Sequence, residues 1–172
     1  MADIYNISSW ATGTIYEEDA IVMVGGLYYY SAFRHMSGVT FFAADLALGR
    51  WSGILVNDNL QRPYFRWRAS YKYSITIKPA AKKIQFGDGY VSEFADGISN
   101  ILLPFDALFE DRSLNQYTAI LHFLSTRAGV EKFYFIPPSP FNVVKKFICS
   151  EWTATQSFYD KYSITAKFEE RV

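Results

Sequence analysis

The strongest constraint on the fold is a run of strict alternation in residues 64–78, YFRWRASYKYSITIK. Apolar or aromatic side chains occupy every second position from Phe65 to Ile77, and polar or charged side chains fill the positions between them. A period of two over this length is typical of a β-strand with one buried face. Fully extended, the run spans about 50 Å, which is longer than a compact small domain needs. We therefore expect this strand either to bend between two sheets or to project towards a neighbouring molecule.

The stretch IQFGDGY, residues 84–90, is the second informative feature. An Asp-Gly pair between apolar strand residues predicts a tight hairpin, because the turn needs a positive φ at its tip. The spacing is not GxGxxG and no helix is predicted after Gly89, so a dinucleotide-binding loop is unsupported. A loop that binds another ligand remains an alternative. We predict a structural hairpin with Gly87, Asp88, Gly89 and Tyr90 at its tip.

The chain divides into two parts at a predicted linker, residues 57–63. This stretch, NDNLQRP, is rich in Asn and ends in Pro, which is typical of a connection between domains. Residues 1–56 contain short aromatic runs broken by Gly and Ser, and they predict a small β module. Residues 64–172 contain further alternating segments and predict a larger β domain.

One helix is expected in the larger domain, near residues 113–128. Ser113 and Gln116 form a capping box at its start, and apolar residues follow at helical spacing. Pro104 cannot donate a hydrogen bond to a ladder, so the strand predicted over residues 101–110 should lie at a sheet edge or a bulge.

Composition narrows the function classes. Aromatic residues make up 19% of the 172 residues, which favours strands and interfaces. Lys plus Arg and Asp plus Glu number 17 each, so the zero net charge argues against nucleic acid or an anionic membrane as the main partner. The N-terminus lacks the pattern of a signal peptide, and the apolar runs are shorter than the about 20 residues of a membrane helix. We expect no membrane insertion and no sequence-specific binding of nucleic acid.

No motif predicts catalysis or metal binding. The two histidines, His35 and His122, lie in different predicted domains, and no spaced set of metal ligands is present. Cys149 is the only cysteine and stands between apolar neighbours on a predicted strand, which favours an inert buried thiol over a nucleophile. We predict no catalytic residue, no metal and no cofactor.

Residues 64–172 also carry several short motifs in a fixed order. These are KKIQFGDGY, a helix followed by FYFIPP, the pair Cys149 and Trp152, and a final strand that ends AKFEE. In this order and spacing they resemble the minor tail protein family of lambda-like siphophages. The resemblance implies a subunit with a tail-tube-like β-barrel or sandwich fold, in a homo-oligomeric ring, a hexamer, at the distal end of the tail tube. With it, the hairpin tip at Gly87, Asp88, Gly89 and Tyr90 is expected to take part in subunit contacts. It implies the tail tube protein and tail-tip hub proteins as partners, a channel through which the genome passes, and a place in the virion tail after assembly in the bacterial host cytoplasm.

Residues 1–56 resemble small chitin-binding-type modules of carbohydrate-binding families 5 and 12. The matching positions are Trp10, Tyr16, Asp19, Val22, Gly26, Tyr28, His35, Ser37, Gly38, Phe41, Asp45 and Trp51. The resemblance implies three short strands and an aromatic platform for a host-surface glycan, for which Trp10, Tyr30 and Trp51 are the candidates. The alternative is that Trp10, Tyr28 and Trp51 only fill the core of a small module. Phe33 and Arg34 stand where typical chitin binders carry paired tryptophans.

Taken together, the sequence predicts an all-β protein with one helix, in which a three-stranded carbohydrate-binding-like module precedes a tail-tube-like barrel or sandwich. The expected function is a structural part of a phage tail, with an outward module that contacts host glycans or packs against other tail proteins. The alternatives are a carbohydrate-binding protein or accessory module of a glycan-active system, and an enzyme, which needs a cleft with converging acids.

Overall fold

The structure is a computed structural model, and it confirms the all-β class with one α-helix among the residues that it describes. Most of the predicted linker falls outside the described residues. These are residues 5–53, 63–77, 79, 81–95 and 102–171.

The N-terminal module (residues 5–53) is built from short strands around a small aromatic core. β2, β3 and β5 form a three-stranded antiparallel sheet, and β1 pairs with β4. Val22, Phe41 and Trp51 are buried at the centre of this core. The elements are β1 (Ile15–Tyr16), β2 (Ile21–Val24), β3 (Leu27–Ser31), β4 (His35–Met36), the π-helical turn η1 (Phe41–Leu46) and β5 (Trp51–Gly53).

The sheet domain (residues 63–171) contains a five-stranded sheet in the order β10-β11-β12-β9-β6, antiparallel throughout. The described strands do not close into the barrel that was one of the two expected architectures. The outermost strands, β10 and β6, are only three and two residues long and do not pair with each other. The strands are β6 (Ser74–Ile75), β9 (Pro104–Arg112), β10 (Phe133–Phe135), β11 (Lys145–Phe158) and β12 (Lys161–Glu170).

The expected strand over residues 64–78 is not a strand along its length, and this prediction was wrong. Among its described residues only β6 belongs to a sheet, while the residues before it are extended without a continuous ladder. This crossing segment (residues 64–75) begins beside β10, where Tyr64 bridges Tyr134, and ends beside β9, where Ser74 pairs with Asp106. It therefore contacts both edges of the five-stranded sheet. The alternation of burial holds at the start of the segment, where Phe65 and Trp67 are buried, but Tyr71, at another of the apolar positions, is fully exposed.

Pro104 is the first residue of β9, a place where its missing N–H group is tolerated. β9 lies between β12 and the short β6, which pairs only with Phe105 and Asp106, so β9 is not an edge strand along its whole length. The alternative expectation of a bulge is met at the other end of β9, where the register with β12 shifts between Phe109 and Arg112. Phe105, Ala107 and Phe109 alternate into the core with no exposed surface, as strand geometry requires.

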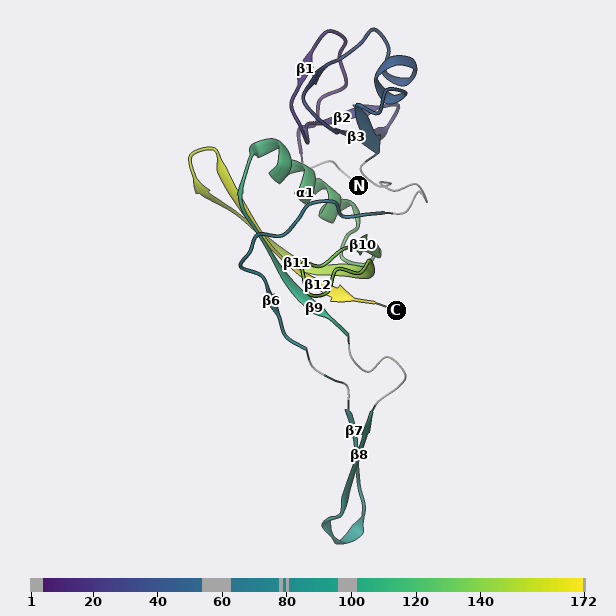
Figure 1. Cartoon of the computed structure of the whole chain (residues 1–172), viewed down its shortest axis with the longest axis vertical. Helices are drawn as coiled ribbons and strands as arrows, with labels where there is room; N and C mark the ends of the chain where they lie inside the picture. Colours follow the sequence, from purple (N-terminus) through teal and green to yellow (C-terminus); the bar gives the residue numbers. More distant parts are fainter. Residues whose placement is uncertain (1–4, 54–62, 78, 80, 96–101, 172) are drawn as a thin grey trace.

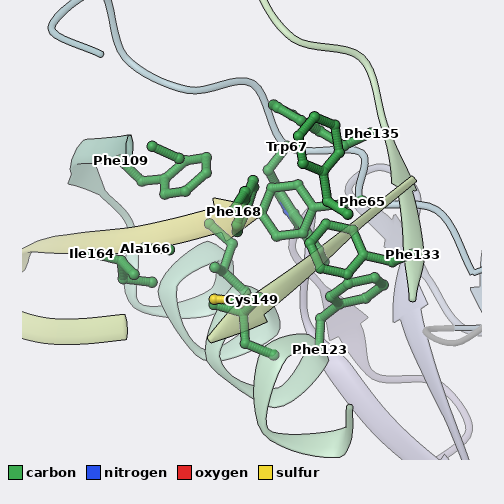
Figure 2. Packing of buried hydrophobic residues seen from close by; sticks show 14 of the residues in the cluster. Phe65, Trp67, Phe109, Phe123, Phe133, Phe135, Cys149, Ile164, Ala166 and Phe168 are labelled. Atoms are coloured by element: carbon green, nitrogen blue, oxygen red, sulfur yellow. The ribbon is translucent and has the colours of Figure 1, made fainter. Parts of the chain in front are cut away.

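The single α-helix, α1 (Leu114–Thr126), follows β9 directly. The Ser113 side chain accepts a hydrogen bond from the backbone N–H of Gln116, as the capping box predicts. The helix packs against the sheet, and Phe65 from the crossing segment lies at the centre of the core between them (Figure 2). Its ring lies 5.1 to 5.8 Å, centroid to centroid, from six other aromatic rings. These belong to Trp67, Phe109, Phe123, Phe133, Phe135 and Phe168.

The hairpin predicted around IQFGDGY is present. β7 (Ala81–Gln85) pairs with β8 (Val91–Ala95), and a single 3-10 turn, η2 (Gly87–Gly89), joins them. Gly89 has the positive φ of 79° that the turn requires. Neither strand pairs with any other strand in the described part of the chain, and the hairpin lies apart from the five-stranded sheet (Figure 1). We call it the projecting hairpin.

Candidate assembly surfaces

The two faces of the projecting hairpin carry different side chains. Ile84 and Phe94 share one face with Lys82 and Ser92, which we call the apolar face after its two large residues, and Lys83, Glu93 and Gln85 share the other, the polar face, with Val91. Cross-strand partners share a face, so Ile84 and Phe94 lie on one side and the ion pair of Lys83 with Glu93 lies on the other. The Lys83 Nζ to Glu93 Oε1 distance is 2.6 Å. Ile84 and Phe94 are 40% and 45% exposed, which is high for apolar side chains on paired strands. An isolated two-stranded hairpin is marginally stable in water, so this apolar face is suited to burial against another surface.

The tip of the projecting hairpin holds the residues predicted for subunit contact. Phe86 and Tyr90 flank the turn, where the Phe86 N–H donates to the Tyr90 carbonyl at 2.9 Å and the two ring centroids lie 6.1 Å apart. The side chains of Phe86 and Tyr90 are 52% and 69% exposed. The side chain of Asp88 lies outside the described part of the structure. The tip therefore carries two exposed aromatic rings next to the glycines of the turn.

A second exposed surface lies at the far end of the β11–β12 hairpin. β10 pairs with β11 only along residues 145–147, while β12 pairs with β11 as far as Phe158. From Glu151 onwards the outer edge of β11 therefore has no strand partner among the described residues. Phe158 and Tyr159 at the turn are 78% and 89% exposed. An unpaired edge of this kind offers backbone donors and acceptors to a further strand.

A groove of about 730 Å³ lies between the crossing segment and the proline-rich loop after β10. Arg112 spans its floor, donating to the backbone carbonyl of Arg68 at 2.8 Å and to Gln116 Oε1 at 3.0 Å. Across the groove the Tyr73 hydroxyl donates to the carbonyl of Ser139 at 2.7 Å. These hydrogen bonds hold the crossing segment in place. We therefore interpret the groove as a space left beside the crossing segment and not as a ligand-binding site.

The N-terminal module meets the sheet domain at Asp19. Its carboxylate is 2% exposed and accepts hydrogen bonds from side chains of the crossing segment and of α1. Arg66 donates at 2.5 Å, the Trp67 indole N–H at 3.2 Å and the Gln116 amide at 3.1 Å. No local pattern in the sequence indicates this cluster, because Arg66 and Gln116 lie 47 and 97 positions away from Asp19.

The three aromatic residues predicted to bind sugar do not form an exposed platform. Trp51 and Tyr30 are each 2% exposed, and they belong to two different buried clusters. Trp10 is partly buried and packs edge-on against Phe41 at 5.8 Å. Stacking on a sugar needs a free ring face, which neither Trp51 nor Tyr30 offers here. The alternative prediction, that these aromatic residues fill the core of the small module, is correct for Trp51. Tyr28 packs instead against the core of the sheet domain.

Trp10 has a structural role beside Asp45. The Trp10 indole N–H donates to Asp45 Oδ2 at 3.1 Å, and Asp45 Oδ1 accepts from the Gly38 N–H at 2.8 Å and from Arg50 at 2.9 Å. Burial alone favours the neutral acid, but these hydrogen bonds outweigh it and hold the pKa of Asp45 below its ordinary value. A Cβ at Gly38 would lie 3.0 Å from Asp45 Oδ1 and 3.2 Å from Ala44 Cβ, so a larger residue there would require these neighbours to shift.

Groups that could carry chemistry are not assembled within the described residues. No group of three or more His, Cys, Asp or Glu side chains there is placed to hold a metal ion. Burial raises the pKa of the Cys149 thiol to about 12, so it stays protonated at neutral pH. His122 is buried between the rings of Tyr5 and Tyr28. In this part of the chain, no helix has the length and apolar character needed to span a bilayer.

The sequence was compared with known protein families. A sequence model described as phage minor tail protein matches residues 63–172, which is more than half of the chain. The chain belongs to the phage minor tail protein family. It is also 25% identical over 108 residues to "Tail tip protein M" of Escherichia phage lambda, a match that covers 63% of this chain and 96% of the lambda protein.

Family membership gives this minor tail protein a structural role in a phage tail. The family match includes the crossing segment, the projecting hairpin, the five-stranded sheet and α1, and so it contains both exposed surfaces described above. Residues 1–62 lie outside it. The resemblance of residues 1–56 to chitin-binding modules has no support from this match.

Proposed function

We propose that this minor tail protein forms a ring of six copies at the distal end of the tail tube and joins the tube to the tail-tip hub proteins. The name of the lambda relative, a tail tip protein, supports this position in the tail. The observation that carries the proposal is the projecting hairpin, whose exposed apolar face and aromatic tip have no covering element among the described residues. A neighbouring copy in the ring covers this surface.

The unpaired outer edge of β11 supports the same proposal. Proteins manage exposed strand edges by shortening, charging or covering them. Here the edge from Glu151 to Phe158 carries no positively charged residue, because the two lysines of β11, Lys145 and Lys146, lie at the other end of the strand. The chain also has zero net charge, which favours association over solubility as a monomer. In a ring with closed cyclic symmetry, every copy buries such a surface against its neighbour.

The ring places its copies around a channel for the genome, and the protein needs no sequence-specific contact with nucleic acid and performs no catalysis. It assembles into the tail in the cytoplasm of the bacterial host. The tail tube protein and the hub proteins are its partners on the two sides of the ring.

For the N-terminal module we propose a packing role against other tail proteins, in preference to glycan binding. The buried rings of Tyr30 and Trp51 favour this choice. We expect the purified protein to give no signal on a glycan array. A reproducible signal that Trp10→Ala abolishes without unfolding the protein contradicts the packing proposal and restores the sugar site.

The role of the projecting hairpin is tested by complementation of a phage that lacks this protein. Ile84→Ser combined with Phe94→Ser removes the apolar face, and we expect infectious particles and tail-bound protein to fall by at least about tenfold, since two exposed apolar contacts are lost. Gln85→Ser on the polar face of the same hairpin is the matched control and should complement fully. Full complementation by the double variant contradicts the proposal.

A further inference from the structure

The N-terminal module covers the side of α1 that faces away from the five-stranded sheet (Figure 1). The ring of Tyr28 lies 4.3 Å from the ring of His122, centroid to centroid. The Tyr5 hydroxyl and the Ser125 hydroxyl are 2.9 Å apart and share a hydrogen bond. His122 is 4% exposed although it lies off the apolar stripe of the helix, so the module buries a second face of α1.

Polar groups bind the two parts together at one end of this contact. Asp19 of the module reaches Arg66, Trp67 and Gln116 of the sheet domain, as described above. A buried carboxylate is costly unless it is paired and fully hydrogen-bonded, and here all of its side-chain partners come from the other domain. The Arg66 guanidinium also lies 4.3 Å from the centroid of the Tyr30 ring, which the module contributes to the core of the sheet domain.

The sheet-domain side of this contact lies within the part of the chain that matches the family, and the module side lies outside it. Arg66, Trp67, Gln116 and His122 lie within the residues that match the family, whereas Asp19 and the tyrosines of the module lie outside them. The match to the lambda protein takes up 96% of that protein, which leaves it almost no sequence for a comparable module. The sheet domain therefore has a surface that binds a second protein domain. In this chain that domain, the N-terminal module, is covalently attached.

We infer that the side of α1 that faces away from the sheet, together with Arg66, is a protein-docking surface. The N-terminal module of the same chain is the partner that binds to it. The recognised chemistry is a tyrosine-rich sheet with one carboxylate that enters between Arg66 and Gln116. The attachment through residues 54–62 raises the local concentration of the module, but the contact itself holds it in place. The inference concerns contacts within one chain and does not depend on the ring.

The test separates the contact from the covalent link in the folded full-length protein. A site for a specific protease is inserted after residue 58, and the purified protein is cleaved there. The product is then passed over a size-exclusion column at about 1 µM. At this concentration a complex with a sub-micromolar Kd stays together. We expect the two fragments to elute together. Elution as two separate species overturns the inference, because the module is then held by its linker alone.

Variants identify the carboxylate as the centre of the contact. Asp19→Asn leaves Arg66 with only the longer ion pair to Glu18, at 3.7 Å, and puts an amide NH2 group in place of one of the two oxygens that accept from Trp67 and Gln116, so we expect at least tenfold weaker association after cleavage. Glu17→Gln, which alters a nearby exposed ion pair with Arg34, is the matched control and should behave as the wild type. If Asp19→Asn does not fold, Gln116→Glu tests the same point by charge repulsion. Unchanged association in a folded variant overturns the role of Asp19.

Discussion

At the residue scale, one ring organises the core of the sheet domain. Phe65 is 1% exposed and contacts aromatic side chains from the crossing segment, α1 and three strands of the five-stranded sheet, β9, β10 and β12. It lies outside those strands, on a segment whose path is fixed at its two ends by β10 and β9. The packing of Phe65 is therefore what ties the crossing segment to the sheet between these ends.

Truncation of this ring should be strongly destabilising. For Phe65→Ala we expect a loss of about 3 to 5 kcal/mol in the free energy of unfolding, because the cavity is surrounded by rigid rings. Urea denaturation followed by circular dichroism measures it. Tyr71→Ala is the control on the same segment, since Tyr71 is fully exposed, and it should change stability by less than about 0.5 kcal/mol. Similar effects for both variants contradict the central position of Phe65.

Asp45 gives the N-terminal module a predictable dependence on pH. Its pKa is lowered in the folded state, so its contribution is present above the unfolded value of 3.8 and is lost as pH falls through the lower folded value. At pH 7 we expect Asp45→Asn to destabilise the protein by about 1.5 to 3 kcal/mol. Urea titrations at pH 7, 5 and 3.5 should show this difference shrinking at the lowest pH. A difference that stays constant with pH contradicts the assignment.

At the scale of elements, the sequence predicts local features well and partners poorly. The capping box at Ser113 and the turn at Gly89 depend on nearby residues, and both are found as predicted. The alternation in residues 64–78 predicts a strand with one buried side. Phe65 and Trp67 are buried as expected, but Tyr71 is exposed, and the alternation does not indicate which backbone pairs with the segment. That depends on β9 and β10, which follow about 30 and 60 residues later, and a period of two contains no information about them.

The candidate surfaces divide in the same way. The projecting hairpin is visible in the sequence because its turn is local, whereas the Asp19 contact unites residues from three distant segments. The sugar platform was the weakest prediction. A small module needs large rings to fill its own core, so aromatic residues there indicate burial as readily as binding.

At the scale of the whole molecule, the N-terminal module is a docked body, and the projecting hairpin and the outer edge of β11 are the surfaces left for other proteins. Their exposed apolar side chains and unpaired strand edge are the features that we expect of a subunit in a closed assembly. The zero net charge agrees with this, because proteins without net charge repel one another weakly and associate more readily.

The central claim is that copies of this minor tail protein form a closed ring at the end of the tail tube. The most direct measurement is electron microscopy of tails that carry a tagged copy, with rotational averaging of the labelled layer and of the purified protein. We predict a layer of six-fold symmetry at the distal end of the tube, which is lost with the Ile84→Ser and Phe94→Ser double variant. A strictly monomeric protein that is absent from tails contradicts the account.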